Sequence, residues 1–267
     1  MICRRRLAPC STKRPANSAL VLPVFATMGY FNIYAQLIVD SITRLRVLAN
    51  PMVKLVFLRQ VHVTAVSSLR LVSVVALVIG TAFVKHVTEV LGADPRAFDL
   101  VELVLVHNVA PLATAFIIIG RSAAAVSTEL AMMDRDGEIR ALADLRISVQ
   151  DYLIVPRVAA ITLATAGCCF YFQVIAVIGG FSVSSLMLDI SLDDQLRRFA
   201  EHVHILGIAL DVVKSLCFGF FVAIIACGVG LTSVQRMAKV QQVPAQAFLR
   251  ALVAVITIDI VFLLNLL

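Results

Sequence analysis

Long apolar runs constrain this chain more than any other feature of its sequence. Five of them lie near residues 61–84, 100–120, 153–180, 205–231 and 248–267. Each approaches or exceeds the roughly 20 residues that a helix needs to cross about 30 Å of hydrocarbon. A soluble domain keeps its apolar residues in stripes or in alternation, whereas 60% of this chain is hydrophobic and in runs. The predicted fold class is therefore an all-α membrane protein with five transmembrane helices.

The first 54 residues are predicted to form a basic amino-terminal segment, followed by a membrane domain over residues 55–267. Pro23 interrupts an uncharged run over residues 19–39, and no small-x-small cleavage site follows, which argues against a signal peptide. The second half of this run is amphipathic, which is typical of a helix lying in the membrane interface. Its apolar side comprises Tyr34, Leu37, Ile38, Ser41, Ile42, Leu45 and Leu48, and its polar side Gln36, Asp40, Arg44 and Arg46.

Basic residues predict which ends of the spans face the cytoplasm, because lysine and arginine are enriched in cytoplasmic loops. With the amino terminus inside, the inner segments hold the basic amino-terminal block, Arg121, Arg135, Arg140, Arg146, Arg236, Lys239 and Arg250. The outer loops keep Lys85, Arg96, Arg197 and Arg198. This topology accounts for the net charge of +6. No nucleic-acid partner is predicted, since the basic residues do not gather on one polar face with interleaved aromatics.

The loop between the second and third runs predicts a short amphipathic helix on the cytoplasmic side. Asp136 is suited to cap the amino terminus of a helix, and Glu138 is favourable in its first turn. The apolar stripe consists of Ile139, Leu142 and Leu145, and the polar positions are Glu138, Arg140 and Asp144. The stripe either binds a partner or packs under the spans of its own chain, and the pattern leaves both open.

Several short patterns occur in order in and around this loop. They are G-R-S-A-A at residues 120–124, E-L-A-M-M at 129–133, E-I-R-A-L at 138–142 and Y-L-I-V-P-R-V-A-A at 152–160. The chain thereby resembles the MlaE/YrbE permeases of Mce-type lipid transporters, which carry G-R-x-G-A, E-L-G-x-M, E-x-I-D-A-L and Y-L-x-V-P-R-x-x-A. The likeness extends from about residue 55 to the carboxyl terminus through F-L-R-Q at 57–60, Gly179-Gly180 closing the third run, and K-S-L-C-F-G at 214–219.

The chain departs from the family pattern at three places. His107-Asn108-Val109-Ala110-Pro111 stands where the family has R-E-L-G-P, so both charges are missing. Ala131 replaces the glycine of E-L-G-x-M, and Arg140 replaces the aspartate of the I-D-A-L element. These changes fit a diverged paralogue that pairs with a second, different permease.

The resemblance implies a permease subunit of an ABC transporter for lipids, most simply phospholipids, in a bacterial inner membrane. It implies no cofactor and no catalysis in this chain, and ATP hydrolysis in a separate cytoplasmic ATPase. The residues expected to couple to that ATPase are Asp136, Glu138, Ile139, Arg140, Leu142 and Leu145. Further implied partners are a second permease copy or paralogue in a dimer, membrane lipids, and an Mce-domain lipid-binding protein outside. The expected lipid cavity lies at the dimer interface.

Polar residues inside the runs are further site candidates. Because polar side chains in a span usually face the bundle interior, His107 and Asn108, with Pro111 beside them, are predicted to line the cavity. Asp211 and Lys214 are three residues apart, so they share a helix face and can pair. A lysine there costs about 3 kcal/mol on insertion scales, so it should face protein or water. The pair either contacts lipid headgroups or fixes helix packing.

Two other function classes remain open from the sequence. An ion-coupled secondary transporter would use Asp211, Lys214 and Asp259, and an intramembrane enzyme would use His202, His204 and Asp211. The chain has no G-x-x-x-x-G-K-[ST] loop for ATP. No metal site is predicted, because the six cysteines lack CxxC or Cys/His spacing and the two alternating histidines have no further ligands.

Overall fold

Helices account for nearly all of the residues that the computed structural model describes, which are 30–44, 51–91, 95–188, 191–202, 205–236 and 240–266. No strand occurs within these ranges. Several residues discussed above lie outside them, namely Pro23, Leu45, Arg46, Leu48, His204 and Lys239. The side chain of His202 is also outside the description.

Five helical segments are long and apolar enough to cross a membrane, which confirms the predicted fold class. They are α3 (Pro51–Leu91), the continuous run of α4 (Pro95–Leu100), η2 (Val101–Val109), α5 (Ala110–Ile118), η3 (Ile119–Ala123) and α6 (Ala124–Arg135), the run of η4 (Gln150–Ile154) and α8 (Val155–Leu188), α10 (Ile205–Arg236), and α11 (Val243–Leu266). The helices are longer than the apolar stretches because they continue into polar turns at their ends. With 41 residues, α3 is about 60 Å long at 1.5 Å per residue.

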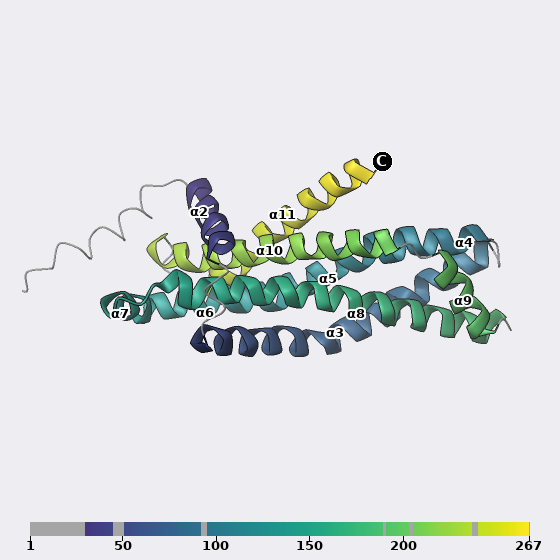
Figure 1. Cartoon of the computed structure of the whole chain (residues 1–267), viewed down its shortest axis with the longest axis horizontal. Helices are drawn as coiled ribbons and strands as arrows, with labels where there is room; N and C mark the ends of the chain where they lie inside the picture. The colour runs from purple at the N-terminus through teal and green to yellow at the C-terminus, as the bar shows by residue number, and fades with distance from the viewer. Residues whose placement is uncertain are drawn as a thin grey trace, which may run out of the picture.

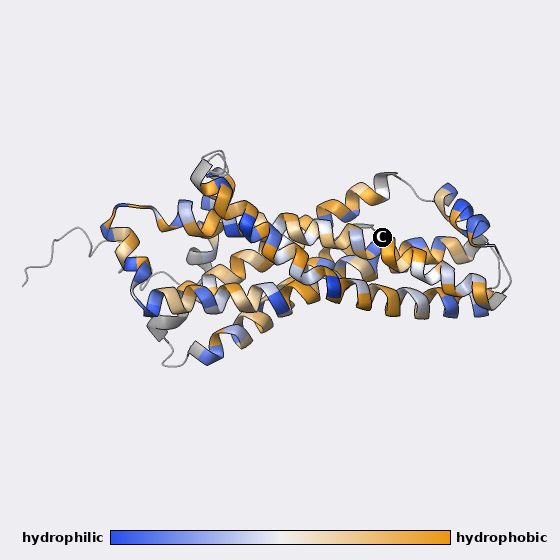
Figure 2. Ribbon diagram, turned by 90° about the horizontal axis from the view of Figure 1, so that it is seen from below, coloured by the Kyte–Doolittle hydropathy of each residue, from blue (hydrophilic) through white to orange (hydrophobic). Residues whose placement is uncertain are grey.

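The spanning helices lie along the long axis of the molecule (Figure 1). The short helix α7 (Glu138–Asp144) lies at one end of the bundle, and α4 and α9 (Leu192–His202) lie at the other. These are called the α7 end and the α9 end below. The 3-10 turn η5 (Val240–Gln242) precedes α11, whose last turns diverge from the bundle. Hydrophobic residues predominate between the two ends, as expected for a membrane-spanning bundle (Figure 2).

Glycines bring α3 and α8 into close contact. A Cβ atom on Gly80 would lie 2.3 Å from the carbonyl oxygen of Ala176, and one on Gly180 would lie 2.5 Å from Cγ2 of Val84. Only a residue without a side chain allows such an approach of two helices. The expectation that Gly179-Gly180 closes the third span is wrong, because α8 continues to Leu188. The helix needs Gly180 for contact with α3, not for termination.

The helix α2 (Tyr30–Thr43) lies across the bundle nearer the α7 end (Figure 1). Leu37 and Ser41 are buried, and Tyr34 and Ile38 pack against the core, in line with the predicted apolar side. Ile42 was assigned to the same side but is 56% exposed. The position of α2 in the membrane interface stays a prediction, as does the domain division after residue 54.

Candidate functional site

Five polar side chains from four helical segments meet inside the bundle, and we call them the polar cluster. They are His107 of η2, Gln173 of α8, Asp211 and Lys214 of α10, and Asp259 of α11. All lie within candidate membrane spans. Along its span His107 is closer to Ala97, at the α9 end, than to Arg135, so the cluster lies in the half of the bundle nearer the α9 end.

Asp211 stands at the centre of the cluster. Its Oδ2 accepts a hydrogen bond of 2.9 Å from Nε2 of Gln173 and lies 2.8 Å from Nδ1 of His107. The Asp211 side chain is only 5% exposed. A carboxylate buried to this degree needs hydrogen-bond donors, because an uncompensated charge in an apolar interior is costly. His107 and Gln173 supply those donors from two other helices.

Pro111 explains why backbone carbonyls join the cluster. It has no N–H to donate to the carbonyl of His107 four residues earlier, and the N–H of Ala110 donates to Leu105, five residues back. Side chains take over these carbonyls: Nζ of Lys214 lies 3.3 Å from the oxygen of His107. Likewise, Nε2 of Gln173 donates to the oxygen of Val106 at 3.2 Å. The wide π-helical turns of η2 thus supply acceptors where a regular α-helix would have none.

Lys214 pairs with α11, so the predicted pairing with Asp211 on its own helix is wrong. Its Nζ lies 2.7 Å from Oδ1 of Asp259. The contact is an ion pair by distance, without hydrogen-bond geometry at that oxygen. Nζ also lies 5.8 Å from the ring centre of Phe218, within cation–π range. Lys214 is therefore enclosed by protein, as a charged residue in an apolar run should be.

The predicted cavity residues differ in their contact with the cluster. The His107 ring reaches Asp211 because Gly207 leaves room for it: a Cβ atom there would lie 2.7 Å from Cε1 of the ring. Nε2 of His107 also lies 3.6 Å from a carboxyl oxygen of Glu102. Asn108 does not join, since its amide donates to the carbonyl of Leu103 on its own helix at 2.7 Å. The lining of a lipid cavity by His107, Asn108 and Pro111 stays a prediction.

At the α7 end, all residues of α7 are at least partly exposed. Ile139 and Leu142 are partly buried, while Leu145, which follows the helix, is 70% exposed. The predicted amino-terminal cap is wrong, because Asp136 ends α6 and Gly137 precedes α7 without a side-chain cap. The chain turns sharply between the two helices, and Gly137 takes a φ of +82° that a side chain would strain.

Residues 57–264 match the family described as Permease MlaE. The chain belongs to the MlaE permease family. A relative from Synechocystis sp., named a probable ABC transporter permease protein, is 28% identical over 201 residues, which cover 74% of this chain and 76% of the relative. A Rickettsia prowazekii protein of the same description is 25% identical over 215 residues, 78% of this chain and 79% of the relative.

A plant relative also matches this MlaE-family chain. It is the chloroplastic protein TRIGALACTOSYLDIACYLGLYCEROL 1 of Arabidopsis thaliana, 26% identical over 211 residues, which cover 76% of this chain and 59% of the relative. The family and the names of the relatives support an ABC permease. With the five apolar helices, they indicate a multi-pass membrane protein.

Two of the family-like sequence patterns meet in an ion pair near the α7 end. Nη2 of Arg157, from the Y-L-I-V-P-R-V-A-A stretch, donates to a carboxyl oxygen of Glu129, from E-L-A-M-M, at 2.7 Å. Arg157 is buried, and its Nη1 has no hydrogen-bond partner within the described residues. The pair joins α6 to α8 on either side of residues 136–149, which contain α7 and are called the α7 segment below. The spacing of the patterns alone did not show that these residues touch.

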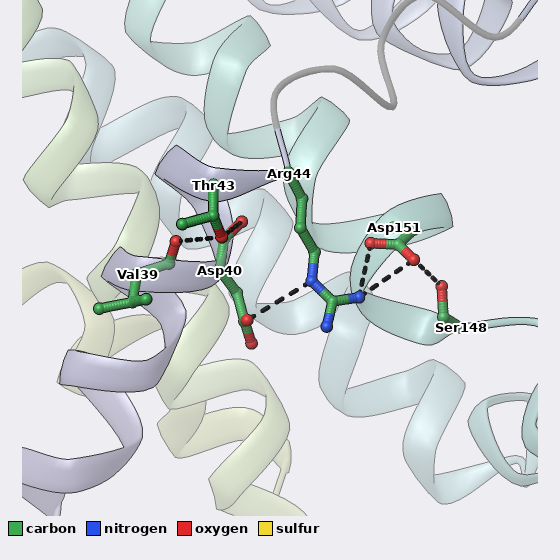
Figure 3. Close-up of polar contacts among 6 residues, drawn as sticks. All are labelled: Val39, Asp40, Thr43, Arg44, Ser148 and Asp151. Atoms are coloured by element: carbon green, nitrogen blue, oxygen red, sulfur yellow. Dashed lines mark hydrogen bonds and ion pairs between the residues drawn. The ribbon is translucent and has the colours of Figure 1, made fainter.

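A second ion pair holds α2 to the start of the third span (Figure 3). Nη1 of Arg44 donates to both carboxyl oxygens of Asp151, at 2.9 and 3.1 Å, and Ser148 donates to the same carboxylate. The Arg44 Nε also lies 3.5 Å from Asp40 on its own helix. The hydrogen bond to Asp151 raises the pKa of Arg44 above its ordinary value, so the guanidinium stays charged. This network positions the end of α2 beside the start of the third span.

Proposed function

We propose that the chain is the membrane-spanning subunit of an ABC transporter that moves lipids, most simply phospholipids. It would lie in a bacterial inner membrane and exchange lipids with an Mce-domain partner outside. The family match supports a permease. The Arabidopsis relative bears the name of a glycerolipid, which supports lipid as the cargo class. ATP hydrolysis would take place in a separate subunit.

The observation that carries the proposal is the exposed α7 segment between the second and third spans. Leu145 presents an apolar side chain at a polar end of the bundle, where a partner protein would remove it from water. The segment is attached on both sides to long spans, α6 and α8, which the Arg157–Glu129 pair joins. A force applied to α7 would therefore act on both spans together.

The orientation in the proposal places the α7 end in the cytoplasm. Arg135, Arg140 and Arg146 lie in or beside the α7 segment, and lysine and arginine mark cytoplasmic loops. The polar cluster then lies in the outer half of the membrane, on the side of the Mce-domain partner. There it connects four helical segments, so movement of α11 relative to α10 would strain the Lys214–Asp259 pair.

A dimer with a second permease, identical or paralogous, completes the proposal. The family pattern places two charges where this chain has His107 and Asn108. A paralogue that retains those charges would supply them from the other half of the cavity. Purification of the complex and mass spectrometry of its permease subunits would distinguish one kind of chain from two.

Co-purification with an ATPase tests the proposal. We expect the tagged chain, extracted from its native membrane, to bring an ATPase with it. Leu145→Asp should abolish that association, because a carboxylate would have to be buried against the partner. Leu186→Asp is the matched control, since Leu186 is 83% exposed but lies at the α9 end of α8. Retention of the ATPase by both variants would contradict a docking role for α7.

An ion-coupled secondary transporter is the second candidate, and the polar cluster is the observation that favours it. His107, Asp211 and Asp259 are titratable groups inside candidate spans, as in proton-coupled carriers. Lipid or solute movement by the purified chain in vesicles with a proton gradient and no ATPase would support this candidate. Movement that requires both ATP and the co-purified ATPase would exclude it.

A further inference from the structure

A pocket lies at the α9 end, where α3, α4, α8 and α9 meet. Its volume is about 140 Å³. The walls are mostly apolar and include Val84 and Val87 of α3, Phe98 of α4 and Phe181 of α8. The ring centres of Phe98 and Phe181 are 6.0 Å apart. None of the five residues of the polar cluster lines this pocket, so it is a separate feature of the bundle.

Gln195 of α9 brings an unpaired amide to this pocket. The residue lines the pocket and is only 4% exposed, yet neither its Nε2 nor its Oε1 has a hydrogen-bond partner among the described residues. It lies four residues before Phe199, on the same face of α9, and the Phe199 ring packs 5.5 Å from that of Phe181. An amide buried without partners is unfavourable, because it has lost water and gained nothing in exchange. An occupant that both donates and accepts hydrogen bonds would remove that cost.

The volume of the pocket limits the apolar part of such an occupant. An engineered apolar cavity of about 150 Å³ in another protein binds benzene, so this pocket has room for a group of the size of one aromatic ring. Phe98 and Phe181 favour a ring there, since aromatic groups attract each other in edge-to-face and offset arrangements. The pocket is partly open, so a polar substituent on the ring does not have to fit inside the apolar walls.

The charges around the pocket favour an uncharged occupant. Asp194 and Arg198 line it as well, and both are exposed to solvent. Arg198 already takes part in an interaction with another group. The two opposite charges give an ion no net attraction, and an ion would have to leave water for apolar walls. The pocket therefore selects for hydrogen bonding rather than for charge.

We propose that this pocket binds a small uncharged molecule that carries a carboxamide or lactam on a body of about the size of one aromatic ring. The ligand's carbonyl would accept a hydrogen bond from Nε2 of Gln195, and its N–H would donate to Oε1. The ring would pack against Phe98 and Phe181. A bound ligand would join α9 to α3, α4 and α8 without contacting the polar cluster or the α7 segment.

Water is the competing occupant, and the pocket suits it less well. A buried water molecule needs two to four polar partners. The hydroxyl of Thr88, which also lines the pocket, is already bonded to the carbonyl of Val84 and to Ser184. Beyond Gln195, the interior thus offers water few partners, and its apolar walls would stay poorly covered. An amide with a ring satisfies the glutamine and covers the walls together.

Ligand-observed fluorine NMR of the full-length chain in detergent tests the proposal, with 4-fluorobenzamide and fluorobenzene as probes. We expect saturable binding of 4-fluorobenzamide. Gln195→Met keeps the length of the side chain but removes the amide, so the affinity should fall about tenfold, as two neutral hydrogen bonds are lost. Fluorobenzene, which uses only the walls, should bind Gln195→Met at least as well as the wild type. Gln242→Met is the matched control, because Gln242 is an exposed glutamine of η5 outside the pocket.

Ala97→Phe tests the location while the Gln195 amide remains. Ala97 lines the pocket and is 6% exposed, so the added ring would fill part of it, and binding of both probes should be lost. Thermal unfolding without ligand checks that each variant is folded, and the Gln195→Met comparison stands without this variant.

Three results would overturn the proposal. The first is an equal affinity of 4-fluorobenzamide for the wild type and Gln195→Met, which would give the amide no role. The second is binding of 4-fluorobenzoate as tight as that of 4-fluorobenzamide, which would contradict selection for an uncharged ligand. The third is the absence of saturable binding by either probe, which would leave the pocket to water. All three are independent of ATPase association, which Leu145→Asp tests.

Discussion

The polar cluster holds charged side chains in an apolar region of the molecule, whereas the α7 segment holds an apolar side chain in a polar region. The cluster holds Asp211 and Lys214 among apolar helices, and α7 leads to Leu145, which is exposed at a polar end of the bundle. The cluster is satisfied within the chain, by contacts of 2.7–2.9 Å across four helical segments. By contrast, the described residues leave the Leu145 side chain largely exposed.

The difference between the polar cluster and the α7 segment indicates which region would bind a partner. A buried charge that is paired inside the chain is a feature of the chain's own architecture, and its removal should act on folding. An exposed apolar residue directly after a short helix is compatible with a stable chain, and its removal should act on assembly. Variants in the two regions should therefore separate stability from association.

The largest expected effect comes from unpairing Lys214. Asp259→Leu should destabilise the chain by about 3 kcal/mol, because a buried ammonium loses its counter-charge. Lys214→Met combined with Asp259→Leu should recover most of that loss. Denaturant unfolding in a fixed detergent measures both, and the double-mutant cycle isolates the pair. Equal destabilisation by the single and double variants would show that packing, not charge, determines the effect.

A smaller effect should follow from crowding His107 without changing a charge. Gly207→Ala places a methyl group 2.7 Å from the ring position, so the ring must move away from Asp211. We expect a loss of about 1–2 kcal/mol, typical of overpacking. Gly167→Ala is the control, since nothing lies within 4 Å of its Cβ position. Similar unfolding curves for the two variants would contradict tight placement of the ring.

The Arg44–Asp151 pair should contribute less, because it is partly exposed to solvent. Arg44→Gln should cost at most about 1 kcal/mol, the usual contribution of a surface ion pair. Its effect should shrink further in high salt, which screens exposed charges. Thermal unfolding at low and high ionic strength checks this. A salt-independent loss would assign the contact to a more enclosed environment than the structure shows.

The smallest effect on stability is expected in the α7 segment. Leu145→Ser should change the free energy of unfolding of the isolated chain by no more than about 0.5 kcal/mol, as is usual for exposed positions. The same substitution should weaken binding of the ATPase. Unfolding of the isolated chain and co-purification from the membrane measure the two quantities separately. A marked loss of stability would mean that Leu145 packs on its own chain.

The sequence predicts the spans well because long uncharged runs have few other structural solutions. It predicts their partners poorly. Helix spacing shows only contacts within one helix, which is why the sequence suggested that Asp211 can pair with Lys214 and gave no sign of its contact with His107. Gln173 was missed, although a single amide in the third apolar run is a signal for an interhelical hydrogen bond. Gly137 was likewise a better sign of the helix boundary than Asp136, since a glycine there permits a left-handed turn.

Labelling of single cysteines with a membrane-impermeant maleimide tests the central claim most directly. In a chain whose six native cysteines are replaced by serine, Leu145→Cys and Leu186→Cys, introduced one at a time, place a single reactive group at the α7 end or the α9 end. The account predicts that intact cells with a permeabilised outer membrane label Leu186→Cys alone. Leu145→Cys should react only after the inner membrane is opened. Labelling of Leu145→Cys in intact cells would put α7 outside, beyond the reach of any cytoplasmic ATPase.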